Sequence, residues 1–230
     1  MNFLALCQSL HQETIDSGTG PSTVVSQTGQ NGRTVKWVKD YYTSLQNERE
    51  DWLWLHKSFT VSTVAADGAY AWTDCTDTVT AVAIDRFSRW YRNSFKAYLT
   101  ADGVGTEYPL IWLEWERFRR LYRYGTQTDG QPTHVSMDPT QAFVLGPKSS
   151  AIYVVSGDYQ RGPQILALDA DTPELPLRFH DLLVFGAMQK YGGRQVAVEA
   201  MVRAAAEGGP LLSALERDQL PPMTWGNSLA

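Results

Sequence analysis

The sequence predicts an α+β protein in which a helical bundle built from both chain termini carries an inserted antiparallel β domain. Leu175 to Tyr191 is apolar around most of its helical circumference, so a helix there must be covered on several sides. Arg33 to His56 places apolar residues at alternating steps of three and four, which is one helix face. At Lys57 the apolar period changes to two, which is typical of strands.

These patterns divide the chain into three parts. We expect residues 1–56 and 166–220 to form the helical bundle, residues 57–165 to form the β domain, and residues 221–230 to form a C-terminal tail. Asn2 can cap a first helix with Phe3, Leu6, Cys7 and Leu10 on its apolar face, which ends near Thr14. Small polar residues from Asp16 to Gly32 predict a long loop before the second helix.

The β domain is predicted from short apolar runs separated by turn signals. Because helices mostly do not separate these runs, we expect antiparallel pairing. One helix, Leu113 to Tyr124, interrupts them. After the strand beginning at Lys57, the expected strands are Ala69 to Trp72, Val79 to Ile84, Ser94 to Leu99, Thr133 to Met137, Ala142 to Leu145 and Ile152 to Tyr159.

The C-terminal helices carry their own start and stop signals. Pro176 fits the first turn of the 175–191 helix, and Gly192-Gly193 predicts its end. Gln195 to Leu220 returns to a helical pattern, but Gly208-Gly209-Pro210 lies inside it. Two glycines cost about 1 kcal/mol each against alanine and an interior proline about 3 kcal/mol, so we expect a kink or two separate helices there.

Composition limits the function classes. A net charge of −5 argues against a protein whose main task is to grip the phosphate backbone. Cys7 and Cys75 lack metal-ligand spacing and are expected to be free thiols in a reducing compartment. No run approaches the roughly 18 apolar residues of a membrane span, and no export signal is found, so a soluble protein without a membrane partner is expected.

Enzyme-like clusters are few. His180-Asp181 lies beside Arg178, but adjacent helical residues point about 100° apart, so a core histidine and a dipole-compensating aspartate are favoured over an acid-base pair. Asp74-Cys75-Thr76-Asp77 matches no calcium or zinc pattern and is expected to be a surface turn. Nucleotide-binding and nucleophile motifs are missing from the sequence. We therefore predict that the protein is not an enzyme and that it has no catalytic residue, no cofactor and no metal site.

Two arginine groups interleave with aromatic residues. One group lies in a loop and consists of Arg86, Arg89 and Arg92. The other lies on the interrupting helix and consists of Arg117, Arg119, Arg120 and Arg123. They are either solvated faces or a protein docking surface, and we favour docking, with single-stranded nucleic acid as the third choice. The expected partner-interface residues are Arg117, Arg120, Arg123, Trp115, Tyr124, Gln219, Leu220 and Trp225.

Several segments suggest a family when taken in order. They are the opening helix, Gly-Thr-Gly-Pro-Ser-Thr-Val-Val at 18–25, Leu-Gln-Asn at 45–47, Asp-Trp-Leu-Trp-Leu at 51–55, the Leu175-Pro176 to Phe179-His180 stretch and Leu-Glu-Arg-Asp-Gln-Leu-Pro at 215–221. Together they resemble tailed-bacteriophage head-to-tail adaptors, also called connectors or neck proteins. The layout is more distantly similar to the tail tubular protein A of short-tailed phages. The resemblance covers both terminal thirds of the chain.

The resemblance implies a non-enzymatic structural protein of the virion neck, made in the host cytoplasm. It implies a homo-oligomeric ring, usually a dodecamer in this family, that binds the portal protein and a tail, nozzle or tail-terminator protein while DNA passes through its lumen. In the family the C-terminal end reaches the portal and the β domain faces the tail. Two alternatives from other classes remain open: a carbohydrate- or peptide-binding module that uses aromatic residues of the β domain, and a hydrolase with a site near His180.

Overall fold

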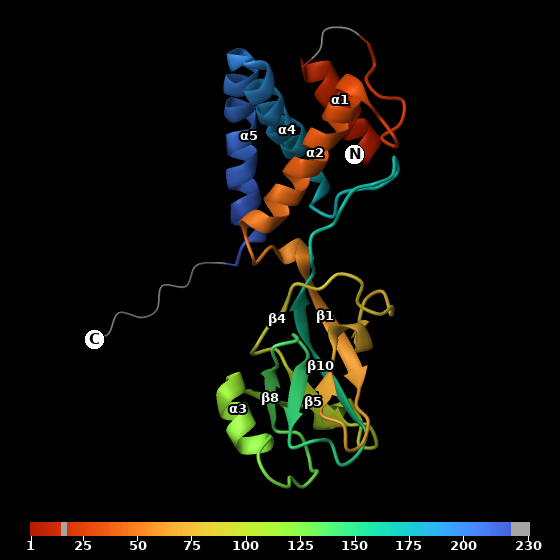
Figure 1. The fold of residues 1–230 in the computed structure, drawn as a ribbon, viewed down its shortest axis with the longest axis vertical. Coiled ribbons are helices and arrows are strands. Elements are labelled where there is room, and N and C mark those ends of the chain that lie inside the picture. Colours follow the sequence, from red (N-terminus) through yellow and green to blue (C-terminus); the bar gives the residue numbers. More distant parts are fainter. Residues whose placement is uncertain (15–17, 222–230) are drawn as a thin grey trace, which may run out of the picture. The chain divides into compact units, whose positions relative to one another are not determined.

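A computed structural model describes residues 1–14 and 18–221 of the chain (Figure 1). Contacts divide the chain into a helical unit, Met1–Leu55 with Pro163–Ala230, and a β unit, His56–Gly162. The fold is α+β, and its inserted unit is built from strands, as the sequence predicts. The expected boundaries after residues 56 and 165 differ from these by one and three residues. Residues 222–230 of the expected tail lie outside the described part of the chain.

The first helix forms as expected. Helix α1 (Phe3–Thr14) begins after Asn2, whose side-chain oxygen accepts a hydrogen bond from the Ala5 backbone N–H at 2.9 Å. This bond satisfies one of the backbone donors that the first helical turn leaves without an intrahelical acceptor. The predicted apolar face is buried.

The second helix is shorter than predicted. Helix α2 (Gly29–Glu48) begins before Arg33 and ends eight residues before His56. Arg49 is extended, with φ of −128°, and the Trp52 indole then folds back to donate to the Leu45 carbonyl at 3.0 Å. Trp52 is therefore buried because the chain folds back, not because the helix continues. After Trp52 the chain forms the 3₁₀ turn η1 (Leu53–Leu55).

Helix α4 (His180–Gln195) occupies the centre of the helical unit and contacts α1, α2 and α5. Two predictions about its ends are wrong. Pro176 precedes the 3₁₀ turn η4 (Leu177–Phe179) instead of starting the α-helix, and Gly192-Gly193 does not stop it. Gly192 instead permits close packing, because a Cβ there would lie 2.4 Å from the Met201 Cγ.

Helix α5 (Val198–Gln219) continues through Gly208-Gly209-Pro210 as one helix. Of the two expected outcomes, a kink or two separate helices, the second is therefore wrong. Gly208 is buried, and a Cβ there would lie 3.2 Å from the Phe185 Cβ of α4. Pro210 removes the donor for the Ala206 carbonyl, but Ala206 is exposed, so water can supply that hydrogen bond. Close packing on α4 offsets the low helix propensity of this segment.

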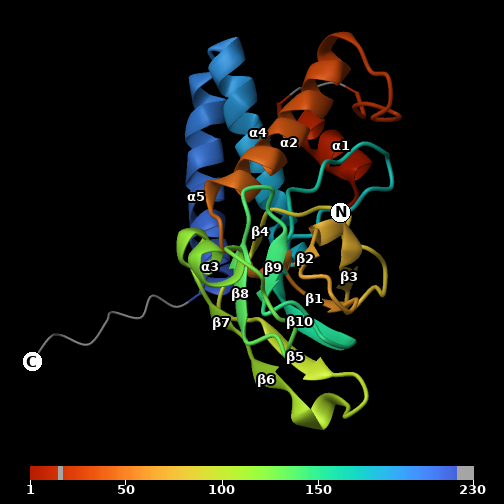
Figure 2. The same ribbon diagram turned by 60° about the horizontal axis from the view of Figure 1, so that its bottom comes forward.

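The β unit contains two sheets, and Figure 2 shows the second with α3 (Trp115–Tyr122) beside β8. The first sheet has the order β3-β1-β10-β5-β6, with β4 also paired to β10, and the second has the order β2-β9-β8-β7. Strand pairs are antiparallel except β7 with β8. The strands are β1 (His56–Ser62), β2 (Ala69–Tyr70), β3 (Thr76–Asp77), β4 (Arg89–Trp90), β5 (Lys96–Leu99), β6 (Tyr108–Pro109), β7 (Ile111–Trp112), β8 (His134–Met137), β9 (Phe143–Gly146) and β10 (Tyr153–Gln160).

One expected strand is wrong, and four short strands were not predicted. Residues 79–84 form no strand, because the Asp77 carboxylate accepts hydrogen bonds from the Val79 and Thr80 backbone N–H groups, both at 2.9 Å, and closes a turn. Val79 is accordingly 83% exposed. The unpredicted strands β3, β4, β6 and β7 span two residues each, which is too short to show a period of two.

Aromatic residues fill the core between the two sheets. Phe59 of β1, buried, lies within 4.6 Å of the Trp90 ring and 5.9 Å of the Phe143 ring, measured between centroids. Phe95 and Tyr159 complete the cluster. Within the described part of the chain, no tryptophan is exposed. Packing therefore accounts for much of the aromatic excess.

Candidate functional site

Helix α3 is fixed to the second sheet by its inner side. Phe118 is fully buried with Leu113 and Val144, and Tyr122 packs beside them. The Tyr122 hydroxyl lies 2.8 Å from the His134 Nδ1. This helix is therefore a rigid support, which suits a binding surface better than a loop does.

The outer side of α3 and the residues after it carry the predicted arginines. Arg117, Arg120 and Arg123 recur every third residue and are all exposed. Tyr124 is 58% exposed and Leu121 49%. We call these five residues the α3 arginine face. In the described part of the chain, no carboxylate pairs with Arg120 or Arg123. Their charges are therefore available to a partner.

Trp115 and Arg119, on the same helix, are less exposed than the α3 arginine face. Trp115 was predicted as an interface residue, but it is half-buried against Phe118, with the Arg119 guanidinium 6.0 Å from its ring centroid. Arg119 also pairs with Glu116 at 3.3 Å. Burial lowers the pKa of His134, and the charge of Arg117 lowers it further. His134 beneath this helix is thus favoured in its neutral form.

The other predicted interface residues lie in the helical unit, at the end of α5. Leu220 is half-buried and packs against the helical core, and its N–H donates to the Glu216 carbonyl at 3.0 Å. Gln219 donates to the Asp218 carboxylate at 2.7 Å. Trp225 lies outside the described residues. The structure therefore brings the α3 residues together and leaves Gln219 and Leu220 in a different unit.

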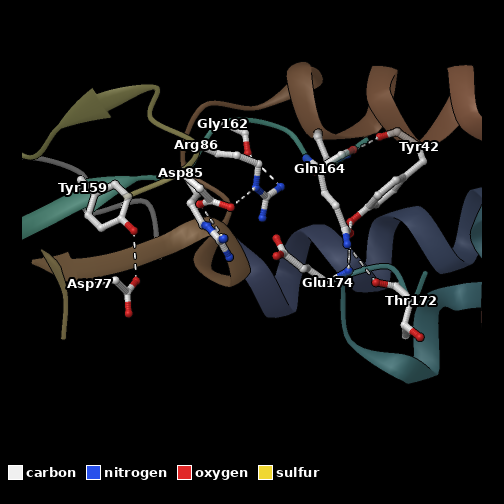
Figure 3. Close-up of polar contacts among 11 residues, drawn as sticks. Tyr42, Asp77, Asp85, Arg86, Tyr159, Gly162, Gln164, Thr172 and Glu174 are labelled. Atoms are coloured by element: carbon white, nitrogen blue, oxygen red, sulfur yellow. Dashed lines mark hydrogen bonds and ion pairs between the residues drawn. The ribbon is translucent and has the colours of Figure 1, made fainter. Parts of the chain in front are cut away.

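Arg86 and Arg92 of the 86–92 loop make contacts with other residues of the β unit. Arg86 donates to the Gly162 carbonyl at 3.2 Å (Figure 3). Arg92 pairs with Glu114 at 2.8 Å and lies over the Trp112 ring. These contacts favour a structural role for this loop over the docking role considered from the sequence.

His180 is a structural histidine in the helical unit. Only 2% of it is exposed, and its Nε2 lies 3.1 Å from the Leu175 carbonyl. Its Nδ1 lies 2.7 Å from the Met1 amino nitrogen and 3.1 Å from the Met1 carbonyl, so the ring joins α4 to the segment before α1. Burial lowers its pKa. Asp181 is exposed and forms no pair with the ring, as expected for neighbours on a helix.

A small cavity of about 210 Å³ in the β unit has no counterpart in the sequence predictions. Tyr159, from β10, donates to the Asp77 carboxylate at 3.0 Å (Figure 3). Arg161 and Asp85, which also line the cavity, pair at 2.8 Å. Burial would raise the pKa of Asp77, but hydrogen bonds from Thr80, Val79 and Tyr159 outweigh burial and lower it. Asp77 has its partners already, so the arrangement holds the turn together.

The Asp74 to Asp77 segment is not the surface turn that the sequence predicted. Asp74 ends a 3₁₀ turn, Thr76 and Asp77 form β3, and Asp77 is buried. Asp74 accepts a hydrogen bond from the Ala71 N–H at 2.9 Å, and Cys75 is buried. Burial raises the pKa of both Cys75 and Cys7 to about 12, so neither thiol ionises near neutral pH. Among residues 1–14 and 18–221, no group of metal-ligating side chains gathers. In the same residues no helix combines the length and apolar character needed to cross a membrane.

A polar network in the helical unit holds the chain as it returns from the β unit. Tyr42 of α2 donates to the Gln164 Oε1 at 2.8 Å, and Gln164 Nε2 donates to the Thr172 carbonyl at 3.1 Å (Figure 3). The Glu174 N–H donates to both Tyr42 and Gln164 oxygens. Residues so far apart in sequence leave no local pattern, so only the fold reveals this site.

Comparison with known proteins adds no family. A scan against protein-family models matched none, and a search of the curated proteins found no match. The functional argument therefore rests on the residues and their geometry.

Proposed function

We propose that this chain is a structural virion protein, a head-to-tail adaptor that forms a ring, joins the portal to the tail and lets DNA pass. The observation that carries the proposal is the architecture: helices from both chain ends pack around α4, with a β unit inserted between them. That layout is the one implied by the adaptor resemblance. It gives one chain two separately folded units, each able to meet a different partner.

The charge distribution supports two different tasks for the two units. The helical unit has nine lysines and arginines against fourteen aspartates and glutamates, whereas the β unit has eleven of each. A densely basic lumen would hold DNA by releasing counterions, so an acidic unit suits a wall past which DNA slides. The α3 arginine face concentrates positive charge on a rigid helix of the otherwise balanced unit.

We assign the α3 arginine face to an acidic surface of a tail component. Arginine and tyrosine are the residues that most often dominate the binding energy of protein interfaces. Arg120 and Arg123 need no internal pair broken before they bind. The end of α5 and the residues after Leu220 are assigned to the portal.

The binding-module alternative has less support. In the described β unit, tryptophans are buried or half-buried and already stacked on protein groups; Trp72, for example, stacks on Phe87 with 5.9 Å between ring centroids. A carbohydrate platform needs an open aromatic face. The hydrolase alternative is also weak, because both nitrogens of His180 already contact backbone groups, Nδ1 those of Met1 and Nε2 the carbonyl of Leu175.

Binding assays with the full chain test the proposal. The chain should be retained by purified portal rings of the same phage, and a truncation after Leu220 should remain folded while losing portal binding. Arg120→Glu combined with Arg123→Glu should lose tail-component binding while keeping portal binding. Arg119→Glu is the matched control, because Arg119 is already paired. Retention by neither portal nor tail component would contradict the proposed function.

A further inference from the structure

An open recess of about 470 Å³ lies between the last turns of α5 and the turn η4 in the helical unit. Its lining residues are Arg178 and Phe179 from η4, and Ala214, Arg217 and Asp218 from α5. The three α5 residues are spaced by three and four positions, which places them on one side of the helix. We call this space the α5 recess.

Apolar groups lie beside the charges of the α5 recess. Phe179 is only 4% exposed, and Ala214 is half-buried against the helical core. The Arg178 guanidinium lies over the Phe179 ring, 4.8 Å from its centroid. An ion pair formed against such apolar groups is screened less than one that water surrounds on all sides.

The two arginines of the α5 recess differ in their partners. Arg178 pairs with the Asp218 carboxylate, and this hydrogen bond lowers the pKa of Asp218. Arg217 is exposed, and its Nε donates to the Ser213 carbonyl at 3.3 Å. Within residues 1–14 and 18–221, no carboxylate pairs with the Arg217 guanidinium. The α5 recess therefore carries one positive charge more than its own carboxylate neutralises.

This positive excess stands out in an acidic unit. The helical unit has nine lysines and arginines against fourteen aspartates and glutamates. Residues 222–230, which follow α5, contain no aspartate or glutamate, so that segment offers no acidic side chain to the recess. Arginine binds a carboxylate through two parallel N–H···O bonds. Charge complementarity therefore favours an acidic side chain of a partner protein as the occupant.

We propose that the α5 recess binds an acidic side chain of the portal protein, with the Arg217 guanidinium pairing with its carboxylate. The inference rests on the proposed function, in which the end of α5 meets the portal, and it names the group that is recognised. Arg178 adds a second positive charge, but Asp218 already pairs with it. Asp218 therefore competes with the incoming carboxylate and limits the affinity.

Surface plasmon resonance of the full chain on purified portal rings of the same phage tests the inference. Arg217→Glu should weaken binding about tenfold or more, because repulsion replaces a charge-assisted pair. Arg217→Lys should weaken it less, since lysine keeps the charge but loses the bidentate geometry. Asp218→Asn should tighten binding about threefold, because it frees Arg178 and removes a competing negative charge.

The matched control is Arg194→Glu, which makes the same charge change at an exposed arginine near the end of α4, outside the recess. It should leave portal binding unchanged. Circular dichroism should be unchanged in every variant, because Arg194, Arg217 and Asp218 are all exposed.

The opposing outcomes separate this inference from the proposed function. Wild-type affinity in Arg217→Glu, or an equal loss in Arg194→Glu, would overturn the inference while leaving the adaptor function standing. Weaker binding in Asp218→Asn would also overturn it, because the pair of Asp218 with Arg178 would then support the interface instead of competing with it. A wild-type chain that does not bind portal rings contradicts the proposed function itself.

Discussion

The helical unit and the β unit build their cores from different side chains. The β unit gathers its aromatic residues between two sheets, with Phe59, Phe95 and Phe143 all fully or nearly fully buried. The helical unit buries a mainly aliphatic core around α4, to which that helix contributes Leu182 and Leu183. The β unit core therefore depends on contacts between aromatic rings, whereas the helical unit core depends on close packing between helices. The following variants test that contrast, from the largest expected effect to the smallest.

Phe59→Ala should destabilise the β unit by about 3–5 kcal/mol, because a buried aromatic ring is lost from a core that cannot fully collapse. Phe59 contacts four other aromatic rings of that core. Hydrogen exchange followed by mass spectrometry on the full chain should show faster exchange in residues 56–162 and little change in the helical unit. Equal loss of protection in both units would show that they unfold together.

Gly186→Ala should destabilise the helical unit by about 1–3 kcal/mol through overpacking. A Cβ at residue 186 would lie 2.0 Å from the Tyr41 ring, so α2 and α4 must move apart or the ring must leave its place. Urea unfolding would measure the change. The matched control is Gly193→Ala on the same helix, where a Cβ meets nothing within 4 Å; it should stabilise by up to about 1 kcal/mol.

A second variant separates the Gly186 clash from other causes. In a Tyr41→Leu background, Gly186→Ala should cost much less, because the ring atoms are gone. An unchanged cost would mean that the ring is not the obstacle.

Asp77→Asn should destabilise the β unit by about 1–2 kcal/mol at neutral pH, because a charged acceptor of several hydrogen bonds is lost. The folded-state pKa of Asp77 is lowered, so its contribution is present above the unfolded value near 3.9 and is lost as pH falls through the folded value. The stability gap between wild type and variant should therefore close as the pH is lowered below about 4. A gap that stays constant down to pH 2 would contradict this role.

Lys36→Ala should change stability by less than about 0.5 kcal/mol. The Lys36–Asp40 pair at 2.7 Å lies on the exposed side of α2, where solvent screens ion pairs and side-chain entropy opposes them. Thermal unfolding would measure it. A loss above 1 kcal/mol would show that this side of α2 is not simply solvated.

Periodicity predicted the parts of this fold that are long and one-sided. The faces of α1 and β1 and the exposure of Arg117, Arg120 and Arg123 follow from spacing alone. The second helix was predicted too long because Trp52 falls on the helical spacing of its apolar face. Trp52 is buried for another reason: the chain turns back after α2, and its indole donates to the Leu45 carbonyl. Gly192 and Gly208 look like helix stops in sequence, but they serve packing between α4 and α5.

Other features depend on residues that are distant in sequence. The Gln164 network joins residues more than a hundred positions apart, and the Asp77 turn draws on Tyr159.

The central claim is that copies of this chain form a closed ring in the virion neck. Cryo-electron microscopy of assembled virions tests it most directly, with the chain docked as two separate units. The account predicts a closed ring of this chain between portal and tail, with the helical units side by side and an open central channel. Virions that lack the chain, or hold it as an isolated copy, would contradict the account.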